Sequence, residues 1–165
     1  MKVLALGGSG GMGRYAVQYL HNIKQIEKIY VADVNSLSAK KFASHFDNRV
    51  EGLKLDIRDF ETLKSEMSKV DIVVNTTGPF FLFAEPILKA AIQTSTHYFD
   101  ICDDWEPTEK MLQMNEDAKK ANITAIIGLG ASPGLTNILA HMAISELDEV
   151  RKVYTGWDMS AAKPE

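Results

Sequence analysis

Short apolar runs alternate along this 165-residue chain with longer stretches in which apolar residues recur at helical spacing. Most of the short runs are apolar at consecutive positions, which is typical of parallel strands covered on both faces. The predicted strands are Val3–Leu6, Lys28–Ala32, Leu53–Leu55, Ile72–Asn75, Tyr98–Ile101 and Thr124–Gly128. Sustained alternation of strands and helices predicts an α/β fold with a doubly wound, mostly parallel six-stranded sheet and helices on both faces.

The segments between the strands carry signals for helices. A side-chain oxygen at an N-cap can accept a hydrogen bond from a free amide of the first turn, and proline fits that turn because its missing N–H has no intrahelical acceptor there. The expected signals are N-caps at Ser36, Asp59 and Ser132, first-turn prolines at Pro86 and Pro133, and periodic stretches over Met12–Ile23 and Thr108–Ala121.

Five glycines crowd the segment GGSGGMGR, directly behind the first predicted strand. Gly8, Gly10 and Gly13 satisfy G-x-G-x-x-G between a strand and a helix, where glycines allow a tight turn, close approach of a pyrophosphate and close helix–strand packing. A phosphate-binding loop of the nucleotide-hydrolase kind is excluded, because Arg14 and Tyr15 stand where it needs lysine and then serine or threonine. The sequence therefore predicts a Rossmann-type dinucleotide-binding domain.

Asp33 ends the second predicted strand about 20 residues beyond Gly13, the spacing at which such domains place a ribose-binding acid. Its carboxylate can accept hydrogen bonds from the adenosine ribose, whereas a 2′-phosphate would meet like charge. No arginine directly follows Asp33. NAD is therefore favoured as cofactor, with NADP possible. A helix cap at the strand end is the alternative role of Asp33.

Two further strand ends belong to the same edge of the predicted sheet. Asp56 and Ile57 follow the third strand, where a carboxylate can reach the exocyclic amine of adenine. Thr76, Thr77 and Gly78 follow the fourth strand, beside the topological switch point at which cofactors lie in such folds. An ordinary polar turn is the alternative for each segment.

Composition narrows the classes of function. A formal net charge of -4 without a cluster of Lys and Arg argues against a nucleic-acid surface. No apolar run approaches the roughly 20 residues of a membrane span. Cys102 is the single cysteine, so an internal disulfide is excluded and a cytoplasmic location is expected. The four histidines are scattered, and no metal site is expected.

Three segments behind the glycine loop, NTTGPFFLFAEPILKAAI, HYFDICDD and GLGASPGLTNILA, together resemble the saccharopine dehydrogenase-like oxidoreductases. The resemblance implies a nicotinamide cofactor bound by an N-terminal Rossmann domain, and a C-terminal domain that contacts an amino-acid-type substrate and forms a homodimer. It implies hydride transfer at a carbon–nitrogen bond. Many family members carry arginine near the position of Asp33, consistent with NADP. The expected cofactor contacts are Gly8, Ser9, Gly10, Gly11, Met12, Gly13, Asp33, Val34, Asp56, Ile57, Thr76, Thr77, Gly78 and Pro79.

Oxidation of an amine needs a base or a charged group that manages the nitrogen proton. Asp100, Asp103 and Asp104 follow the fifth predicted strand, and Asp103 is the candidate for catalysis or substrate contact. In the alternative, Asp104 caps the next helix and the others are solvated. Cys102, between them, is expected to be a buried thiol. The glycines of Gly128–Gly134 are either a second anion-binding rim or a plain strand-to-helix turn.

The expected domain division places the dinucleotide-binding domain at residues 1–149 and the start of a truncated C-terminal substrate and dimerisation domain at 150–165. A strand is predicted at Val150–Trp157. An isolated domain of this kind is expected to bind cofactor without turnover. The short-chain reductase mechanism is excluded, because no tyrosine is followed four residues later by lysine. A non-catalytic dinucleotide-binding sensor or regulatory module is the alternative function.

Overall fold

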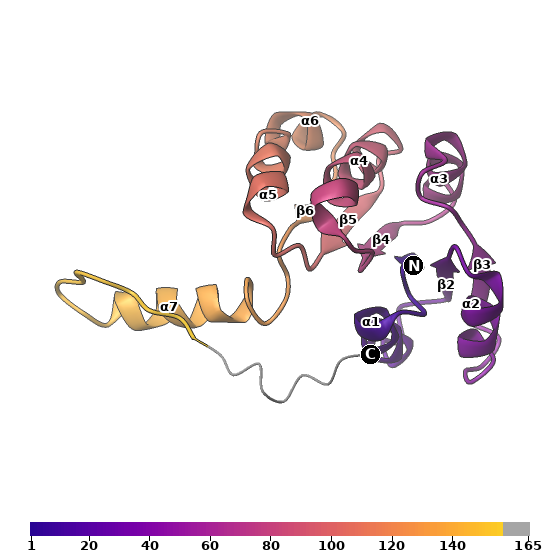
Figure 1. Cartoon of the computed structure of the whole chain (residues 1–165), viewed down its shortest axis with the longest axis horizontal. Coiled ribbons are helices and arrows are strands. Elements are labelled where there is room, and N and C mark those ends of the chain that lie inside the picture. The colour runs from indigo at the N-terminus through magenta and orange to yellow at the C-terminus, as the bar shows by residue number, and fades with distance from the viewer. Residues whose placement is uncertain (157–165) are drawn as a thin grey trace.

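The computed structural model describes residues 1–156, which contain a six-stranded sheet in the order β3-β2-β1-β4-β5-β6 (Figure 1). All five strand pairings are parallel. The strands are β1 (Lys2–Leu6), β2 (Lys28–Asp33), β3 (Val50–Lys54), β4 (Ile72–Asn75), β5 (His97–Asp100) and β6 (Ala125–Ile126). The helices are α1 (Gly11–His21), α2 (Ser36–Ala43), α3 (Phe60–Met67), α4 (Phe80–Gln93), α5 (Trp105–Leu112), α6 (Asn115–Lys120) and α7 (Leu135–Ser145). The doubly wound Rossmann-type prediction is confirmed.

Alternate residues of the central strand point into two separate hydrophobic cores. Val3 and Ala5 pack in one core with residues of α1 and α2, such as Val17. Leu4 and Leu6 pack in the other with residues of α3, α4 and α5. Figure 1 shows α1 and α2 on one side of the sheet and α3 to α6 on the other. Cover on both faces explains why the strands are apolar at consecutive positions.

The order of the strands positions the functional edge. From β1 the chain winds outward through β2 and β3, then returns to the other side of β1 for β4. The connections after β1 and β4 therefore leave the sheet in opposite directions, and a crevice opens between them at the carboxyl ends of the strands. The segments that follow β1, β2, β3 and β4 meet at this edge.

Of the predicted N-caps of α2 and α3, one is confirmed and the other is wrong. The Asp59 carboxylate accepts a hydrogen bond from the Thr62 amide at 3.1 Å, so the predicted N-cap of α3 is confirmed. The predicted N-cap at Ser36 is wrong, because Asn35 caps α2 by accepting from the Ser38 amide at 3.1 Å and Ser36 is the first helical residue. Both side chains can cap, and the end of β2 at Asp33 fixes which one reaches the first turn.

The predicted helix over Met12–Ile23 corresponds to α1, whereas Pro86 and the periodicity over Thr108–Ala121 misplace helix boundaries. Pro86 lies inside α4, which begins after Pro79, because the buried apolar face of α4 outweighs the hydrogen bond that a proline removes. The predicted helix over Thr108–Ala121 is two helices, α5 and α6, separated by a turn in which the Met114 amide donates to the Met111 carbonyl at 3.1 Å.

The segment after β6 forms a closed turn before α7 begins. The Gly130 amide donates to the Pro133 carbonyl at 3.1 Å, and Gly134 takes φ +116°, a conformation that side-chain-bearing residues rarely adopt. α7 therefore begins at Leu135 with Gly134 as N-cap, and the predicted start at Ser132 and Pro133 is wrong. The geometry matches a strand-to-helix turn.

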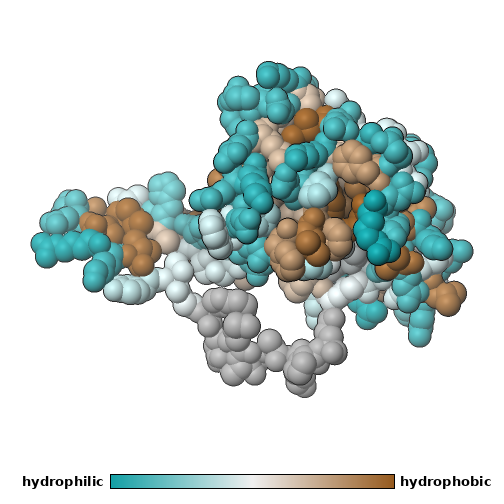
Figure 2. All heavy atoms as spheres, turned by 45° about the horizontal axis from the view of Figure 1, so that its top comes forward, coloured by the Kyte–Doolittle hydropathy of each residue, from teal (hydrophilic) through white to brown (hydrophobic). Residues whose placement is uncertain are grey.

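Helix α7 extends away from the sheet (Figure 1), and within the described part of the chain it buries none of its own residues. Together with the residues that follow it, up to 156, α7 forms an arm, and Figure 2 shows hydrophobic side chains exposed on it. Residues 150–156 are irregular, so the predicted strand there is wrong; Trp157 lies outside the described residues. None of the described helices combines the length and the apolar character of a membrane span.

Candidate functional site

The turn between β1 and α1 contains glycines that serve two different needs. A Cβ at Gly13 would overlap the carbonyl oxygen of Gly7, and one at Gly8 would lie 2.9 Å from the carbonyl oxygen of Ala5. Gly10 has φ −77°, which any residue adopts, and the nearest protein atom to a Cβ there would be the Gly7 oxygen at 3.2 Å. Packing within the protein thus requires glycine at Gly8 and Gly13, whereas glycine at Gly10 keeps the space beside the turn open.

The N-terminus of α1 faces this open space with free amides. The first N–H groups of a helix have no intrahelical acceptors, and the helix dipole adds partial positive charge. Gly10 is the N-cap and makes no side-chain capping bond, and the first turn contains no acidic residue. This end of the 11-residue helix therefore stabilises an anionic group such as a pyrophosphate.

Asp33, the last residue of β2, is held by two neutral donors. The Ser9 hydroxyl of the glycine turn donates to Asp33 Oδ2, and the Asn35 amide donates to Asp33 Oδ1 at 2.9 Å. Ser9 is itself buried, with 3% of its surface exposed. The glycine turn and the end of β2 are thus joined through one carboxylate, whose orientation is fixed.

Asp56 follows β3 and forms an ion pair with Arg58. The Arg58 Nη2 and Nε atoms lie 2.6 and 2.9 Å from the two carboxylate oxygens. Hydrogen bonds from the Arg58 side chain and amide lower the pKa of Asp56 to about 2. The guanidinium is well exposed at the edge of the sheet, so this part of the site carries one paired negative and one paired positive charge.

The segment after β4 presents hydroxyl and amide groups beside the glycine turn. Thr76 Oγ1 donates to the Leu6 carbonyl at 2.9 Å, and the Thr77 amide donates to Asn75 Oδ1 at 3.0 Å. Within residues 1–156, Thr77 Oγ1 is buried without a hydrogen-bond partner, and a Cβ on Gly78 would meet no atom within 4 Å. This loop therefore has room for a neighbouring group and an unused polar atom at the same place.

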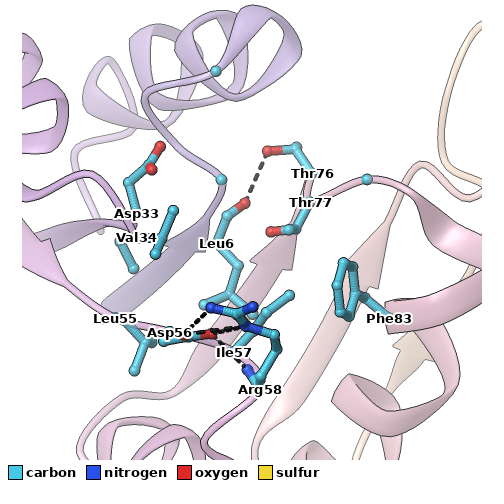
Figure 3. A pocket seen from close by; sticks show the side chains of 14 residues that line it. Leu6, Asp33, Val34, Leu55, Asp56, Ile57, Arg58, Thr76, Thr77 and Phe83 are labelled. Atoms are coloured by element: carbon cyan, nitrogen blue, oxygen red, sulfur yellow. Dashed lines mark hydrogen bonds and ion pairs between the residues drawn. The ribbon is translucent and has the colours of Figure 1, made fainter.

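These four segments line one cavity of about 460 Å³ at the carboxyl edge of the sheet. Figure 3 shows Asp33 and the Asp56–Arg58 pair on one side, with Thr76, Thr77 and Phe83 opposite. The predicted residues that line it are Gly10, Asp33, Val34, Asp56, Ile57, Thr76, Thr77 and Gly78. The predicted residues outside its lining are Gly8, Ser9, Gly11, Met12, Gly13 and Pro79.

Six lining residues escaped the sequence interpretation: Leu6, Gly7, Ala32, Leu55, Arg58 and Phe83. Leu6, Ala32 and Leu55 belong to the buried strand ends, and the apolar pattern assigns them to the core alone. Arg58 had a usable signal, since an aspartate and an arginine two residues apart in a turn can pair. Phe83 lines the cavity because α4 begins at Phe80, earlier than the first-turn position predicted for Pro86 implies.

A chain of buried hydrogen bonds crosses the sheet from this cavity. Asn75 Nδ2 donates to the Tyr98 hydroxyl at 3.1 Å, and the Tyr98 hydroxyl donates to Asp100 Oδ2 at 2.7 Å. Asp100 Oδ1 accepts from the amides of Cys102 and Gly128 at 3.0 and 2.8 Å. Burial and the Asp100 carboxylate raise the pKa of Tyr98 well above its usual value, so its hydroxyl keeps the proton that it donates.

Comparison of the chain with known proteins identifies one family. The family description "Saccharopine dehydrogenase NADP binding domain" matches residues 3–126. The chain belongs to this family. The resemblance expected from the three sequence segments is thereby confirmed.

Relatives of this saccharopine dehydrogenase NADP-binding domain include two curated proteins. A "Lipid droplet localized protein" of Caenorhabditis elegans is 28% identical over 139 residues, which cover 78% of this chain and 32% of that protein. The "Saccharopine dehydrogenase [NADP(+), L-glutamate-forming]" of Schizosaccharomyces pombe is 26% identical over 152 residues, or 92% of this chain and 32% of that protein. The chain thus spans about a third of the length of these relatives.

A solved structure shows the same fold. The apo saccharopine dehydrogenase (L-Glu forming) from Saccharomyces cerevisiae superposes with a TM-score of 0.76 and 23% identity, covering 88% of this chain and 31% of that one. The family description and the name of the Schizosaccharomyces pombe relative both print NADP. They support a nicotinamide dinucleotide as cofactor and favour NADP over the NAD that the sequence predicted.

The residues at the edge of this saccharopine dehydrogenase-type domain fit such a dinucleotide. The open Gly10 turn and the uncapped helix α1 suit its pyrophosphate. The fixed carboxylate of Asp33 suits the hydroxyls of a ribose at one end of the cavity. The orphaned Thr77 hydroxyl and the open space at Gly78 suit close passage of the other half.

The three carboxylates at the end of β5 and just after it do not act as one group. Asp100 is buried, with 1% of its surface exposed, and belongs to the hydrogen-bond chain. The Asp104 side chain accepts a hydrogen bond from the Phe81 amide at 2.9 Å and so caps α4. Asp104 is also the N-cap residue of α5, but within the described residues its side chain makes no capping bond to that helix. Asp103 lines a second cavity of about 620 Å³ between α5 and α7, with Trp105 and His141 among its other lining residues. Its catalytic role stays a prediction.

Two other expectations concern Cys102 and metals. Cys102 is fully buried, and burial raises the pKa of its thiol, as expected of an unreactive cysteine. Across residues 1–156, no group of three or more His, Cys, Asp or Glu side chains is arranged to hold a metal ion.

Proposed function

We propose that this chain is the cofactor-binding domain of an oxidoreductase that transfers hydride at a carbon–nitrogen bond of an amino-acid-type substrate. The observation that carries the proposal is the cavity at the β1/β4 switch point, where the open Gly10 turn meets the uncapped N-terminus of α1. Membership of the family supports a nicotinamide dinucleotide as the ligand of this cavity.

The role of the protein in this proposal is to bind and orient the cofactor. When bound, the dinucleotide supplies the hydride donor or acceptor. The amides at the start of α1 hold the diphosphate, Asp33 accepts from the adenosine ribose, and Asp56 reaches the adenine amine. Thr76, Thr77 and Gly78 line the nicotinamide half, at the end of β4, which lies next to β5 in the sheet.

Turnover requires groups beyond this cavity. In the described part of the chain, its acidic lining residues are Asp33 and Asp56, both assigned to the adenosine half, and it contains no Lys, His or Tyr. The domain is therefore expected to bind cofactor without oxidising or reducing any amino acid by itself. A C-terminal domain that supplies substrate contacts and a homodimer surface completes the proposal.

Titration with NADH and NADPH, followed by ligand fluorescence, tests the proposal. Gly10→Ala is expected to weaken binding of the better ligand at least tenfold, because its methyl group enters the space assigned to the diphosphate. The φ of −77° at Gly10 suits alanine, and its Cβ would lie 3.2 Å from the Gly7 oxygen, a tight contact that a small shift of the turn relieves. The free energy of unfolding should therefore fall by only about 1 kcal/mol.

Gly156→Ala is the matched control, since a Cβ there meets no atom of residues 1–156 within 4 Å and Gly156 lies far from the cavity lining in sequence. Its affinity should equal that of the unchanged chain. Equal affinity in the Gly10→Ala chain, or no binding of either dinucleotide by the unchanged chain, would contradict the proposal.

A further inference from the structure

We infer that this site selects a dinucleotide with a free ribose 2′-hydroxyl, NAD(H), over its 2′-phosphorylated form, and that Asp33 and Ser9 together set the choice. The inference rests on the proposed function, because it concerns the ligand of the same cavity. It departs from the cofactor named for the family and for the Schizosaccharomyces pombe relative, which is NADP.

The first argument is the way in which Asp33 is held. The Ser9 hydroxyl donates to Asp33 Oδ2 and the Asn35 amide to Asp33 Oδ1, so both oxygens are fixed beside the glycine turn. Both donors are neutral, and the carboxylate keeps its full negative charge with lone pairs left for further donors. A ribose hydroxyl supplies a proton to such a lone pair. A phosphomonoester carries about −1.5 to −2 charge at pH 7 and meets the carboxylate as like charge.

The second argument is the balance of charge in the cavity. Within residues 1–156, the lining contains two carboxylates, Asp33 and Asp56, and a single cation, Arg58. Arg58 donates through Nε and Nη2 to Asp56, so the positive charge of Arg58 is already offset by the Asp56 carboxylate. A 2′-phosphate entering beside Asp33 would find no uncommitted positive charge in this lining.

The third argument is the turn from β2 to α2, which borders Asp33. Its residues Val34 and Asn35 are uncharged, and the Asn35 side chain accepts from the Ser38 amide at the start of α2. One donor that could hold a phosphate at this helix start is thus satisfied within the protein. The basic residues of α2, Lys40 and Lys41, lie in its last turn, away from Asp33.

Arg14 is the cation beside Ser9, and its contacts direct it elsewhere. Its Nε donates to the Ser9 carbonyl at 2.7 Å, and its guanidinium carbon lies 5.6 Å from the centre of the Phe42 ring. These contacts place Arg14 between α1 and α2, outside the lining of the cavity. It supports the turn that carries Ser9.

Calorimetric titration of the full chain with NADH, NADPH, 5′-AMP and 2′,5′-ADP tests the inference. We expect NADH to bind at least about tenfold more tightly than NADPH, and 5′-AMP more tightly than 2′,5′-ADP. Asp33→Asn keeps the shape of the side chain and an oxygen for the Ser9 hydroxyl but removes the charge. It should narrow the NADH/NADPH ratio to within about threefold, chiefly through tighter binding of NADPH.

Asp148→Asn is the control, because Asp148 is exposed on the arm behind α7 and the same net charge is lost there. It should leave the ratio unchanged. Ser9→Ala should narrow the ratio as well, since the Asp33 carboxylate is then free to turn away. A purely structural effect of either variant would weaken both dinucleotides equally and leave the ratio intact. Asp33→Ser combined with Val34→Arg should reverse the preference.

The outcomes separate the two proposals. If NADPH binds as tightly as NADH or more tightly, the inference fails while the proposed function stands. If the ratio is the same in the Asp33→Asn and Asp148→Asn chains, the role of Asp33 is refuted. If neither dinucleotide binds, the proposed function fails and the inference with it.

Discussion

At the scale of single residues, the site contains carboxylates that are held in different ways. Asp33 accepts hydrogen bonds from a hydroxyl and an amide, whereas Asp56 is paired with the guanidinium of Arg58. A charged partner favours the ionised form of a carboxyl group, which explains why the pKa of Asp56 is lowered to about 2. The Asp56 carboxylate therefore stays charged in any solution where a dinucleotide would bind.

The Asp56–Arg58 pair predicts a specific pH dependence. The pKa of Asp56 lies below its ordinary value of 3.8, so the pair's contribution to folding is complete well above pH 3.8 and is lost as the pH falls through about 2. Arg58→Gln should move the Asp56 pKa back toward 3.8. An NMR titration of the side-chain carboxyl carbon measures this shift.

The control for that titration is Arg151→Gln, which removes an exposed arginine paired with Glu149 outside the cavity. It should leave the Asp56 pKa unchanged. An Asp56 pKa that stays near 2 in the Arg58→Gln chain would show that other groups hold the carboxylate.

Residue spacing in the sequence predicted much of the site, and the contacts that it did not predict have a physical reason. The G-x-G-x-x-G spacing and the acid about 20 residues later placed Gly10 and Asp33 at one cavity because strand ends of a parallel sheet share an edge. The hydroxyl of Ser9 could not be paired with Asp33 in advance, since the rotamers and the twist of the turn decide that contact. The same holds for the burial of Asp100, which a solvent-facing FDICDD pattern concealed.

At the scale of elements, β3 and α2 are packed as closely as two backbones allow. A Cβ on Gly52 of β3 would lie 2.6 Å from the Lys40 Cα and from the Ala39 carbonyl carbon of α2. A side chain there must push the helix outward. This contact fixes how α2, and with it the turn that follows Asp33, sits against the edge of the sheet.

Gly52→Ala should therefore lower the free energy of unfolding by about 1–3 kcal/mol, the usual range for an overpacked contact. Urea unfolding followed by circular dichroism measures the change, and Gly156→Ala, which adds a methyl group in open space, should be neutral. A Gly52→Ala chain as stable as the unchanged one would mean that α2 yields freely.

Elements were predictable where burial alone decides them. Runs of three or four consecutive apolar residues identified β1 and β4, because a central parallel strand is covered on both faces. Helix starts were less predictable, since neighbouring residues such as Asn35 and Ser36 are both good caps. The choice depends on where the preceding strand ends, and that is a tertiary effect.

At the scale of the whole molecule, the hydrogen-bond chain through Asn75, Tyr98 and Asp100 joins β4, β5 and the segment after β6 inside the sheet. It begins at the loop that lines the cavity, through the Thr77 amide, and ends at the segment that leads to α7. The loop that lines the first cavity is thus connected, through buried hydrogen bonds, to the segments that follow β5 and β6.

Tyr98→Phe removes the hydroxyl at the centre of this chain and leaves Asn75 Nδ2 and Asp100 Oδ2 without that partner. Unsatisfied buried groups cost about 1–3 kcal/mol each, so the free energy of unfolding should fall by at least about 1 kcal/mol. Thermal and urea unfolding measure it. Tyr15→Phe, at a tyrosine that is 71% exposed, should have little effect, and equal stability of both variants would contradict the account.

The order of the strands has a consequence for how the protein is made. β1 is an inner strand, joined on one edge to β2 and on the other to β4. On a ribosome the second neighbour emerges only after residues 72–75, so until then Leu4 and Leu6 lack β4 and the helices α4 and α5 that later cover them. A nascent chain halted before β4 therefore exposes hydrophobic side chains and an unpaired edge of β1. We expect a chaperone that prevents aggregation to bind this first strand.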